Sequence, residues 1–88
     1  MIRVKFPPVL RAVGAREIDV EGCTVREALD NAAKQIPALR LHLFDESGNV
    51  RRHILCIHDS SVVRGPEMAV HRVDAGDEIV LANAFAGG

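Results

Sequence analysis

Apolar and polar residues alternate in two short segments near the start of the chain. In Ile2–Phe6 the apolar residues are separated by basic ones, and in Glu17–Glu21 they are separated by acidic ones. A period of two residues predicts half-buried strands. Pro7-Pro8 ends the first strand, because proline has no amide hydrogen to donate to a strand ladder. The short separation predicts an antiparallel pair joined by residues 7–15.

A helix is predicted to follow the second strand. Thr24-Val25-Arg26-Glu27 is a capping box, in which the Thr24 hydroxyl accepts from the Glu27 amide and the Glu27 carboxylate accepts from the Thr24 amide. Apolar residues then recur at helical spacing on one face: Val25, Ala28, Leu29, Ala32 and Ile36. Pro37 ends the helix. A helix this short is marginal alone, so its apolar stripe must pack on the sheet.

The segment Ala38–Phe44 leaves two interpretations open. Leu39, Leu41 and Leu43 alternate as they would in a strand, but Leu39 and Leu43 also fit one helical turn. The pattern alone does not decide between them.

Apolar runs in the second half of the chain predict three further strands. Ile54–Ile57 suits an interior strand, and Val62-Val63 resumes a brief strand after the polar turn His58–Ser61. Asp74–Asp77 is another tight turn. It leads to Glu78–Ala82, which is apolar on both sides and is therefore predicted to be a central strand.

The order of these elements predicts the α+β class and the β-grasp arrangement. A mixed sheet of four to five strands would carry one main helix on one face, since each apolar face must find a partner. In this arrangement the last strand lies centrally beside the first, and the chain leaves the middle of the sheet as a projecting tail, here about residues 83–88. The 88 residues are expected to form one domain, 1–88.

Composition excludes several classes of function. The net charge of −1 and the pI near 6.4 do not favour nucleic acid, and no apolar run reaches the ~20 residues of a membrane span. The alternating first residues are unlike a signal peptide, so we expect a cytoplasmic protein. The glycines are scattered and form no phosphate-binding loop, so no stably bound cofactor is expected.

Conventional catalytic and metal-binding patterns are also missing. His58–Ser61 holds the residue types of a hydrolase triad, but in consecutive positions, whereas a triad converges from separate segments. Cys56 and His58 would share a strand face, but two ligands do not make a closed metal site, so no metal is expected. Cys23 and Cys56 are expected to be reduced and buried as small apolar residues. The other histidines, His42, His53 and His71, are expected to be isolated and solvated or partly packed.

The ending Ala86-Gly87-Gly88 is the candidate functional group. A carboxylate that is activated by ATP must enter a narrow enzyme site at the end of an extended chain. Glycine lacks a Cβ, so enzyme backbone can approach closely, and glycine permits unusual dihedral angles. The Gly88 carboxylate would be the reactive group, and Gly87 would provide steric clearance. An acyl-adenylate at Gly88 would be open to a sulfur nucleophile and would give a terminal thiocarboxylate.

These features together make the chain resemble the MoaD/ThiS family of β-grasp sulfur carriers from end to end. The matching parts are the first strand Ile2–Phe6, the helix start Thr24–Glu27 with Leu29, the run Val73–Ile79 and the ending Ala86-Gly87-Gly88. Within the family the chain is most similar to the CysO-like carriers of cysteine biosynthesis, through Phe6–Arg11 and a strand ending in Ile57-His58-Asp59. The chain departs from many relatives in having Asn83-Ala84-Phe85 where they carry proline.

The resemblance implies a protein that is acted on by enzymes rather than an enzyme. A MoeB/ThiF-type enzyme would use ATP to adenylate Gly88. A sulfurtransferase or a sulfide source would then form the thiocarboxylate, and a client enzyme would accept the tail and take the sulfur. Phe85, Ala86 and Gly87 would contact these partners.

Two alternative functions and one candidate surface complete the expectations. The chain could be the small subunit of molybdopterin synthase, as in MoaD proper, or a ubiquitin-like modifier or binding module. Val9, Leu10, Leu41 and Phe85 are apolar residues outside the helix stripe and are candidates for a docking patch.

Overall fold

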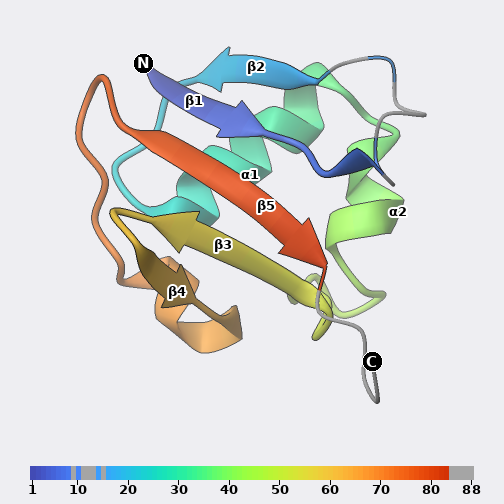
Figure 1. The fold of residues 1–88 in the computed structure, drawn as a ribbon. Helices are drawn as coiled ribbons and strands as arrows, with labels where there is room; N and C mark the ends of the chain where they lie inside the picture. Colours follow the sequence, from blue (N-terminus) through green and yellow to red (C-terminus); the bar gives the residue numbers. More distant parts are fainter. Residues whose placement is uncertain (9, 11–13, 15, 84–88) are drawn as a thin grey trace.

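The chain folds into a five-stranded mixed sheet with its main helix packed across one face (Figure 1). The computed structural model describes residues 1–8, 10, 14 and 16–83. In chain order its elements are β1 (Ile2–Lys5), β2 (Glu17–Val20), α1 (Val25–Gln35), α2 (Leu39–Leu43), β3 (Ile54–His58), β4 (Ser61–Val63), the 3-10 helix η2 (Gly65–Ala69) and β5 (Glu78–Asn83).

The last strand lies in the middle of the sheet. The strand order is β2-β1-β5-β3-β4, and β5 pairs in parallel with β1 and antiparallel with β3. The chain crosses from β1 to the parallel β5 through α1 and the β3–β4 hairpin. The predicted α+β class, the β-grasp arrangement and the central position of the last strand are confirmed.

The main helix begins and ends where the sequence predicts. Thr24 Oγ1 accepts from the Glu27 amide at 3.1 Å, and the helix ends at Gln35, before Pro37. One detail of the predicted capping box is wrong, because the Glu27 carboxylate accepts from the amide of Cys23 at 3.1 Å instead of that of Thr24. The carboxylate reaches back one residue further and still satisfies an amide at the helix start.

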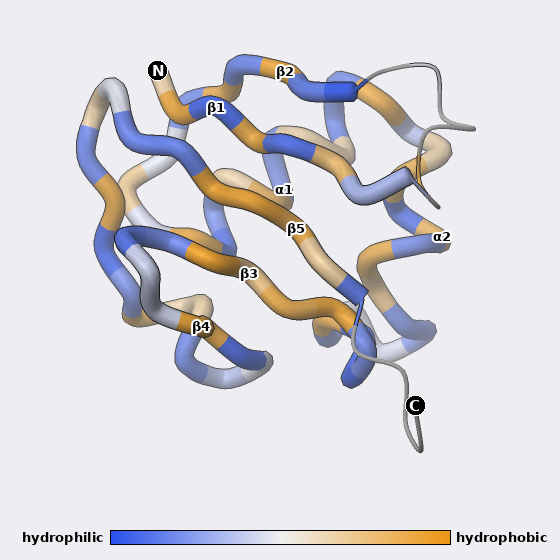
Figure 2. Tube along the Cα trace, in the orientation of Figure 1, coloured by the Kyte–Doolittle hydropathy of each residue, from blue (hydrophilic) through white to orange (hydrophobic). Residues whose placement is uncertain are grey.

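Almost all of the core is aliphatic and lies between α1 and the sheet. The buried face of α1 carries Val25, Ala28, Leu29, Ala32 and Ala33. Figure 2 shows that hydrophobic residues predominate along β3 and β5. The segment left open by its pattern forms the short helix α2, which buries Leu39 and Leu43 and leaves Leu41 exposed.

Two tight turns with positive φ angles connect β3 to β4 and lead into β5. Gly76 has a φ of +92° in the turn before β5, a conformation that glycine adopts without strain. Its amide donates to the carbonyl of Met1 at 2.8 Å, which joins the start of β5 to the start of β1. Asp59 and Ser60 both have positive φ, so the β3–β4 hairpin closes with a two-residue turn of the primed type. Within residues 1–8, 10, 14 and 16–83, no helix is long and apolar enough to cross a membrane.

Truncation of Leu29 tests whether the α1–sheet layer carries the stability of the fold. Leu29 is fully buried, so Leu29→Ala should lower the free energy of unfolding by about 2–5 kcal/mol in urea titrations. Leu41→Ala on the exposed face of α2 is the control and should change that free energy by less than about 0.5 kcal/mol. Equal effects of the two substitutions would contradict the packing described above.

Candidate functional site

The predicted reactive tail follows directly from the central strand. Phe85, Ala86, Gly87 and Gly88 lie outside the described residues. β5 runs to Asn83, one residue beyond the predicted strand end, and Asn83 pairs with Ile54 of β3. Asn83 therefore belongs to the strand and not to the tail, which was expected to begin at about residue 83. The point from which residues 84–88 depart is therefore fixed by a central strand of the sheet.

Beside this point, the sheet face opposite α1 carries a continuous apolar surface. Side chains alternate along β3 and β5, so burial of one set under the helix turns the other set outward. The outward set pairs across the strands, with Leu55 opposite Ala82 and Ile57 opposite both Val80 and Val62. We call these five residues the apolar sheet patch.

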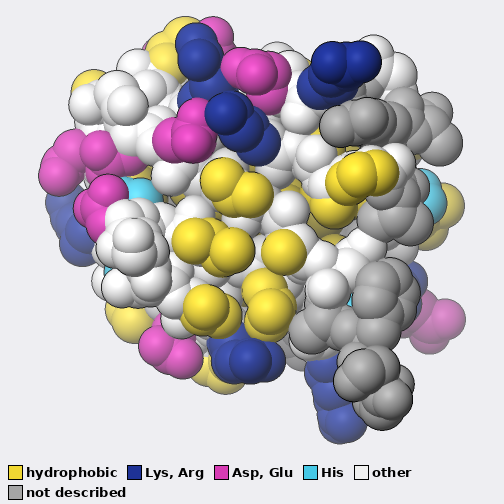
Figure 3. All heavy atoms as spheres, in the orientation of Figure 1, with side chains coloured by type: hydrophobic (Ala, Val, Ile, Leu, Met, Phe, Trp, Pro, Cys, Tyr) yellow, Lys and Arg dark blue, Asp and Glu magenta, His cyan; other side chains and the backbone are white. Residues whose placement is uncertain are grey.

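The apolar sheet patch is bordered by charge. Figure 3 shows hydrophobic side chains in the middle of this face, with charged side chains above them. These charges lie on β1, β2 and the start of β5, where Arg3 pairs with Glu17 at 2.9 Å and Lys5 pairs with Glu78 at 3.2 Å. An exposed apolar area rimmed by polar groups is typical of a protein interaction site.

A groove of about 580 Å³ opens between the ends of β1 and β5. The β1–β5 pairing ends at Lys5 and Val80, whereas β5 continues beside β3 to Asn83. The segment Lys5–Pro8 turns away from β5 and forms the other wall of the groove. Asn83 also lines it, and Asn83 Oδ1 is buried without a hydrogen-bond partner within the described part of the chain. An unpaired buried acceptor is a place where an incoming N–H group gains a hydrogen bond.

Of the four docking residues named from the sequence, the two that the structure describes, Leu10 and Leu41, are not brought together. Leu10 is buried in the core and Leu41 is 77% exposed on α2. Val9 and Phe85 lie outside the described residues. The residues of the apolar sheet patch were missed, although the uninterrupted apolar run of β3 held the signal: it supplies apolar side chains to both faces, and α1 covers only one.

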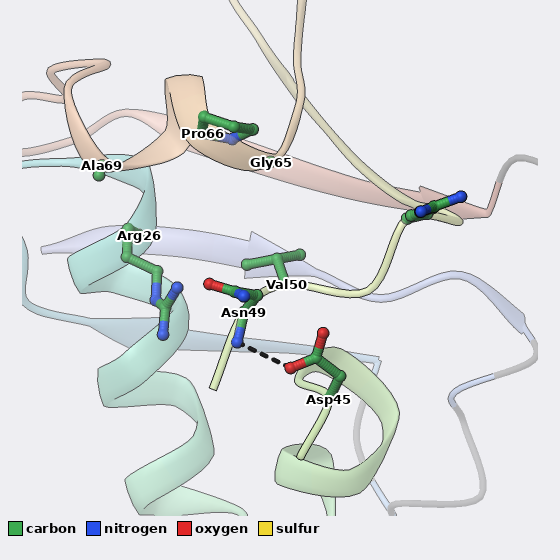
Figure 4. A pocket seen from close by; sticks show the side chains of 8 residues that line it. Arg26, Asp45, Asn49, Val50, Gly65, Pro66 and Ala69 are labelled. Atoms are coloured by element: carbon green, nitrogen blue, oxygen red, sulfur yellow. Dashed lines mark hydrogen bonds between the residues drawn. The ribbon is translucent and has the colours of Figure 1, made fainter. Parts of the chain in front are cut away.

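A second hollow, of about 520 Å³, lies between α1, the loop after α2 and the η2 segment (Figure 4). Arg26 points into it from α1, but this guanidinium is already engaged. It bonds Asp30 at 3.2 Å and the Gly48 carbonyl, and it stacks over the Phe44 ring at 4.6 Å from the centroid. These contacts give Arg26 a structural role in fixing the loop on the helix.

A cluster of histidines and carboxylates lies at the other end of β5. His58 is only 6% exposed. Its Nδ1 is 2.9 Å from His71 Nε2, and its Nε2 is 2.9 Å from Asp77 Oδ2. The prediction that His71 is isolated is therefore wrong. The amide of Asp74 donates to Asp77 Oδ2, and this bond, with that from His58, lowers the pKa of the Asp77 carboxyl.

The two thiols differ in exposure. Cys56 lies inside the core, where burial raises the pKa of its thiol to about 12. Cys23 is exposed, which corrects the expectation that both cysteines are buried. His58 lies on the same buried face of β3 as Cys56, as predicted, but its ring nitrogens face His71 and Asp77.

Solved structures resemble the chain over its whole length. No protein-family model matches the chain, and no curated protein sequence matches it significantly. The small archaeal modifier protein 1 of Haloferax volcanii aligns with a TM-score of 0.78 and 30% identity, covering 99% of this chain and 98% of that one. A chain of the Amycolatopsis orientalis BexX/CysO complex aligns with a TM-score of 0.80 and 25% identity over 100% of both chains. CysO of Mycobacterium tuberculosis aligns with a TM-score of 0.81 over 97% and 100% of the chains, and its 20% identity supports the fold alone.

Thiol alkylation of the native protein tests the difference between the cysteines. Iodoacetamide should modify Cys23 in the folded protein and should modify Cys56 only after unfolding, because the thiolate is the nucleophile and burial both shields the Cys56 thiol and raises its pKa. Intact-mass spectrometry and peptide mapping give the number and position of the labels. Rapid labelling of Cys56 under native conditions would show that β3 is open to solvent.

Proposed function

Because the chain belongs to the MoaD/ThiS family of ubiquitin-like β-grasp sulfur carriers, we propose that it carries sulfur as a thiocarboxylate on Gly88. The observation that carries this proposal is the position of β5. A strand that is paired on both sides ends at Asn83, and residues 84–88 follow it with glycine at the last two positions. Such a chain end is held by a rigid domain while its carboxylate enters a partner's active site.

The proposed chemistry has two steps on the Gly88 carbonyl. A carboxylate oxygen attacks the α-phosphorus of ATP in a MoeB/ThiF-type enzyme, and pyrophosphate leaves. Sulfide then attacks the acyl-adenylate carbonyl, and AMP leaves with the shared oxygen. Where a sulfurtransferase persulfide is the nucleophile, the same attack gives an acyl disulfide, and a thiol then cleaves its S–S bond and takes the sulfurtransferase sulfur into a new disulfide. The sulfur remains on Gly88 as a thiocarboxylate, which a client enzyme consumes when it forms a new carbon–sulfur bond.

The apolar sheet patch is the proposed docking surface for the activating enzyme. Ala82 belongs to the patch and is separated from residues 84–88 only by Asn83, so a partner that receives these residues also covers this face. Leu55 and Ile57 supply apolar area at the centre, and the ion pairs of β1 form one polar edge. The groove beside Asn83 can receive a side chain or an extended segment of the partner. The Amycolatopsis CysO chain is itself described in a complex, with BexX.

Sulfur loading gives the direct test of the function. The protein, mixed with an activating enzyme, ATP and a sulfide source, should gain the mass of one sulfur minus one oxygen, and fragmentation should place the change at Gly88. Cys23→Ser should load as the parent does, because the sulfur is carried on the tail and not as a persulfide. Absence of the mass change, with an activating enzyme shown to work on another carrier, would refute the proposal.

Removal of Gly87-Gly88 separates the role of the tail from that of the fold. The shortened protein should lose all loading, while its melting temperature stays within about 1–2 °C of the parent, because both residues lie beyond the paired part of β5. Circular dichroism and the same loading assay measure the two outcomes. Loading that survives the deletion would place the sulfur elsewhere.

A charge in the apolar sheet patch tests docking. Ile57→Lys should raise the KM of adenylation by about tenfold or more, since a few residues near the centre of an interface carry most of its binding energy and a charge there is desolvated on docking. Leu41→Lys, on the exposed face of α2, should leave this KM unchanged. Pyrophosphate release gives the rates, and thermal unfolding confirms that both variants are folded. An effect of Leu41→Lys equal to that of Ile57→Lys would move the docking surface away from the sheet.

A modifier role is the second candidate function. It is favoured by the 30% identity to a protein named as a small archaeal modifier. A modifier would leave Gly88 in an isopeptide bond with lysines of other proteins. Peptide mapping of conjugates from cells that express the chain distinguishes this outcome from a free thiocarboxylate.

A further inference from the structure

Three side chains of types that commonly ligate metals converge at the start of β5. Atoms of His58, Asp59 and Asp77 that are able to ligate a metal lie within 4.8 Å of one another. His58 Nε2 is 2.9 Å from Asp77 Oδ2 and 3.6 Å from Asp59 Oδ2. Ligand atoms that share a metal at about 2.0–2.2 Å lie about 3.0–3.5 Å apart, so small side-chain movements suffice to bring all three onto one ion.

We propose that His58, Asp59 and Asp77 form a binding site for a divalent first-row transition cation such as Zn²⁺ or Ni²⁺. One imidazole nitrogen and two carboxylates favour these ions over Mg²⁺, which is bound through oxygen ligands. The side chain of Asp59 is 82% exposed, so water completes the coordination of the ion on its solvent-facing side. The site is independent of the tail chemistry, because it lies at the opposite end of β5.

His71 allows His58 to present the unprotonated nitrogen that a metal requires. In one tautomer His71 Nε2 donates to His58 Nδ1, and His58 Nε2 donates to Asp77. In the other, His58 Nδ1 donates to His71 Nε2, and His58 Nε2 carries a free lone pair toward the carboxylates. The 2.9 Å distance between His58 Nδ1 and His71 Nε2 is compatible with either direction of donation. Ligating histidines commonly have such a partner on the second ring nitrogen, which fixes the tautomer and the ring orientation.

The rest of the site is partly preorganised. His58 is held on β3 by burial, and Asp77 is held by the amide of Asp74 at 2.8 Å. Asp59 is the first residue of the hairpin turn and is free to rotate its side chain toward the ion. Within residues 1–8, 10, 14 and 16–83, no Lys or Arg side chain forms an ion pair with Asp59 or Asp77. Their negative charge is thus available to a cation.

Metal titration of the untagged full chain tests the site. Isothermal titration calorimetry with Zn²⁺ or Ni²⁺ should show one site per chain. A metal concentration about tenfold above the measured Kd should raise the melting temperature by about 5 °C or more. Mg²⁺ at the same concentration should leave it unchanged. NMR of the imidazole nitrogens should show the His58 proton on Nδ1 once Zn²⁺ is bound.

Matched variants locate the bound ion. Asp59→Asn suits the positive φ of this turn position and removes one anionic ligand, so it should weaken binding at least tenfold while the metal-free melting temperature is retained. Asp74→Asn removes a nearby charge that is outside the ligand set, and Cys23→Ser removes the exposed thiol. Both should bind as the parent does. Equal stabilisation by Zn²⁺ and Mg²⁺, equal losses in Asp59→Asn and Asp74→Asn, or an unchanged His58 nitrogen spectrum would overturn the proposal.

Discussion

The pairing of β5 with β1 and β3 is the interaction on which the rest of the structure depends. It joins the last strand of the chain to the first in parallel and to the hairpin in antiparallel fashion. Only when β5 is in place does the sheet present one continuous surface for α1, and only then are Ile79 and Leu81 buried. The same pairing rigidly fixes Asn83, so the strand that completes the core also sets the point from which the tail extends.

Local signals were sufficient to predict most of the fold. The Thr24 cap, the spacing of apolar residues after it and Pro37 fix the bounds of α1 within the chain itself, without reference to the sheet. The segment Leu39–Leu43 could not be decided, because burial of Leu39 and Leu43 and exposure of Leu41 depend on where α1 and the sheet already lie. Its helical form is a consequence of tertiary packing, which overrides a short alternating pattern.

The candidate site was less predictable, because its parts meet only in three dimensions. His58, His71 and Asp77 come from a strand, a loop and a turn, separated by 13 and 19 residues from His58, and no short motif joins them. The apolar sheet patch did have a signal in the sequence. Leu55 and Ile57 alternate with the buried Ile54 and Cys56, and a strand that is apolar on both faces in a domain with one main helix leaves one apolar face for a partner.

The surfaces at the two ends of β5 differ in their chemistry, and the distance between them matters for a carrier. Six residues of strand place them roughly 17–20 Å apart. At the Asn83 end the surface is apolar and the Oδ1 atom of Asn83 has no hydrogen-bond partner among the described residues, which suits the proposed docking of a partner. At the Asp77 end the surface is anionic, and Asp77 is hydrogen-bonded to His58 at the end of β3 and to the amide of Asp74. A cation bound at the proposed site would join β3 to β5 without obstructing the proposed docking face.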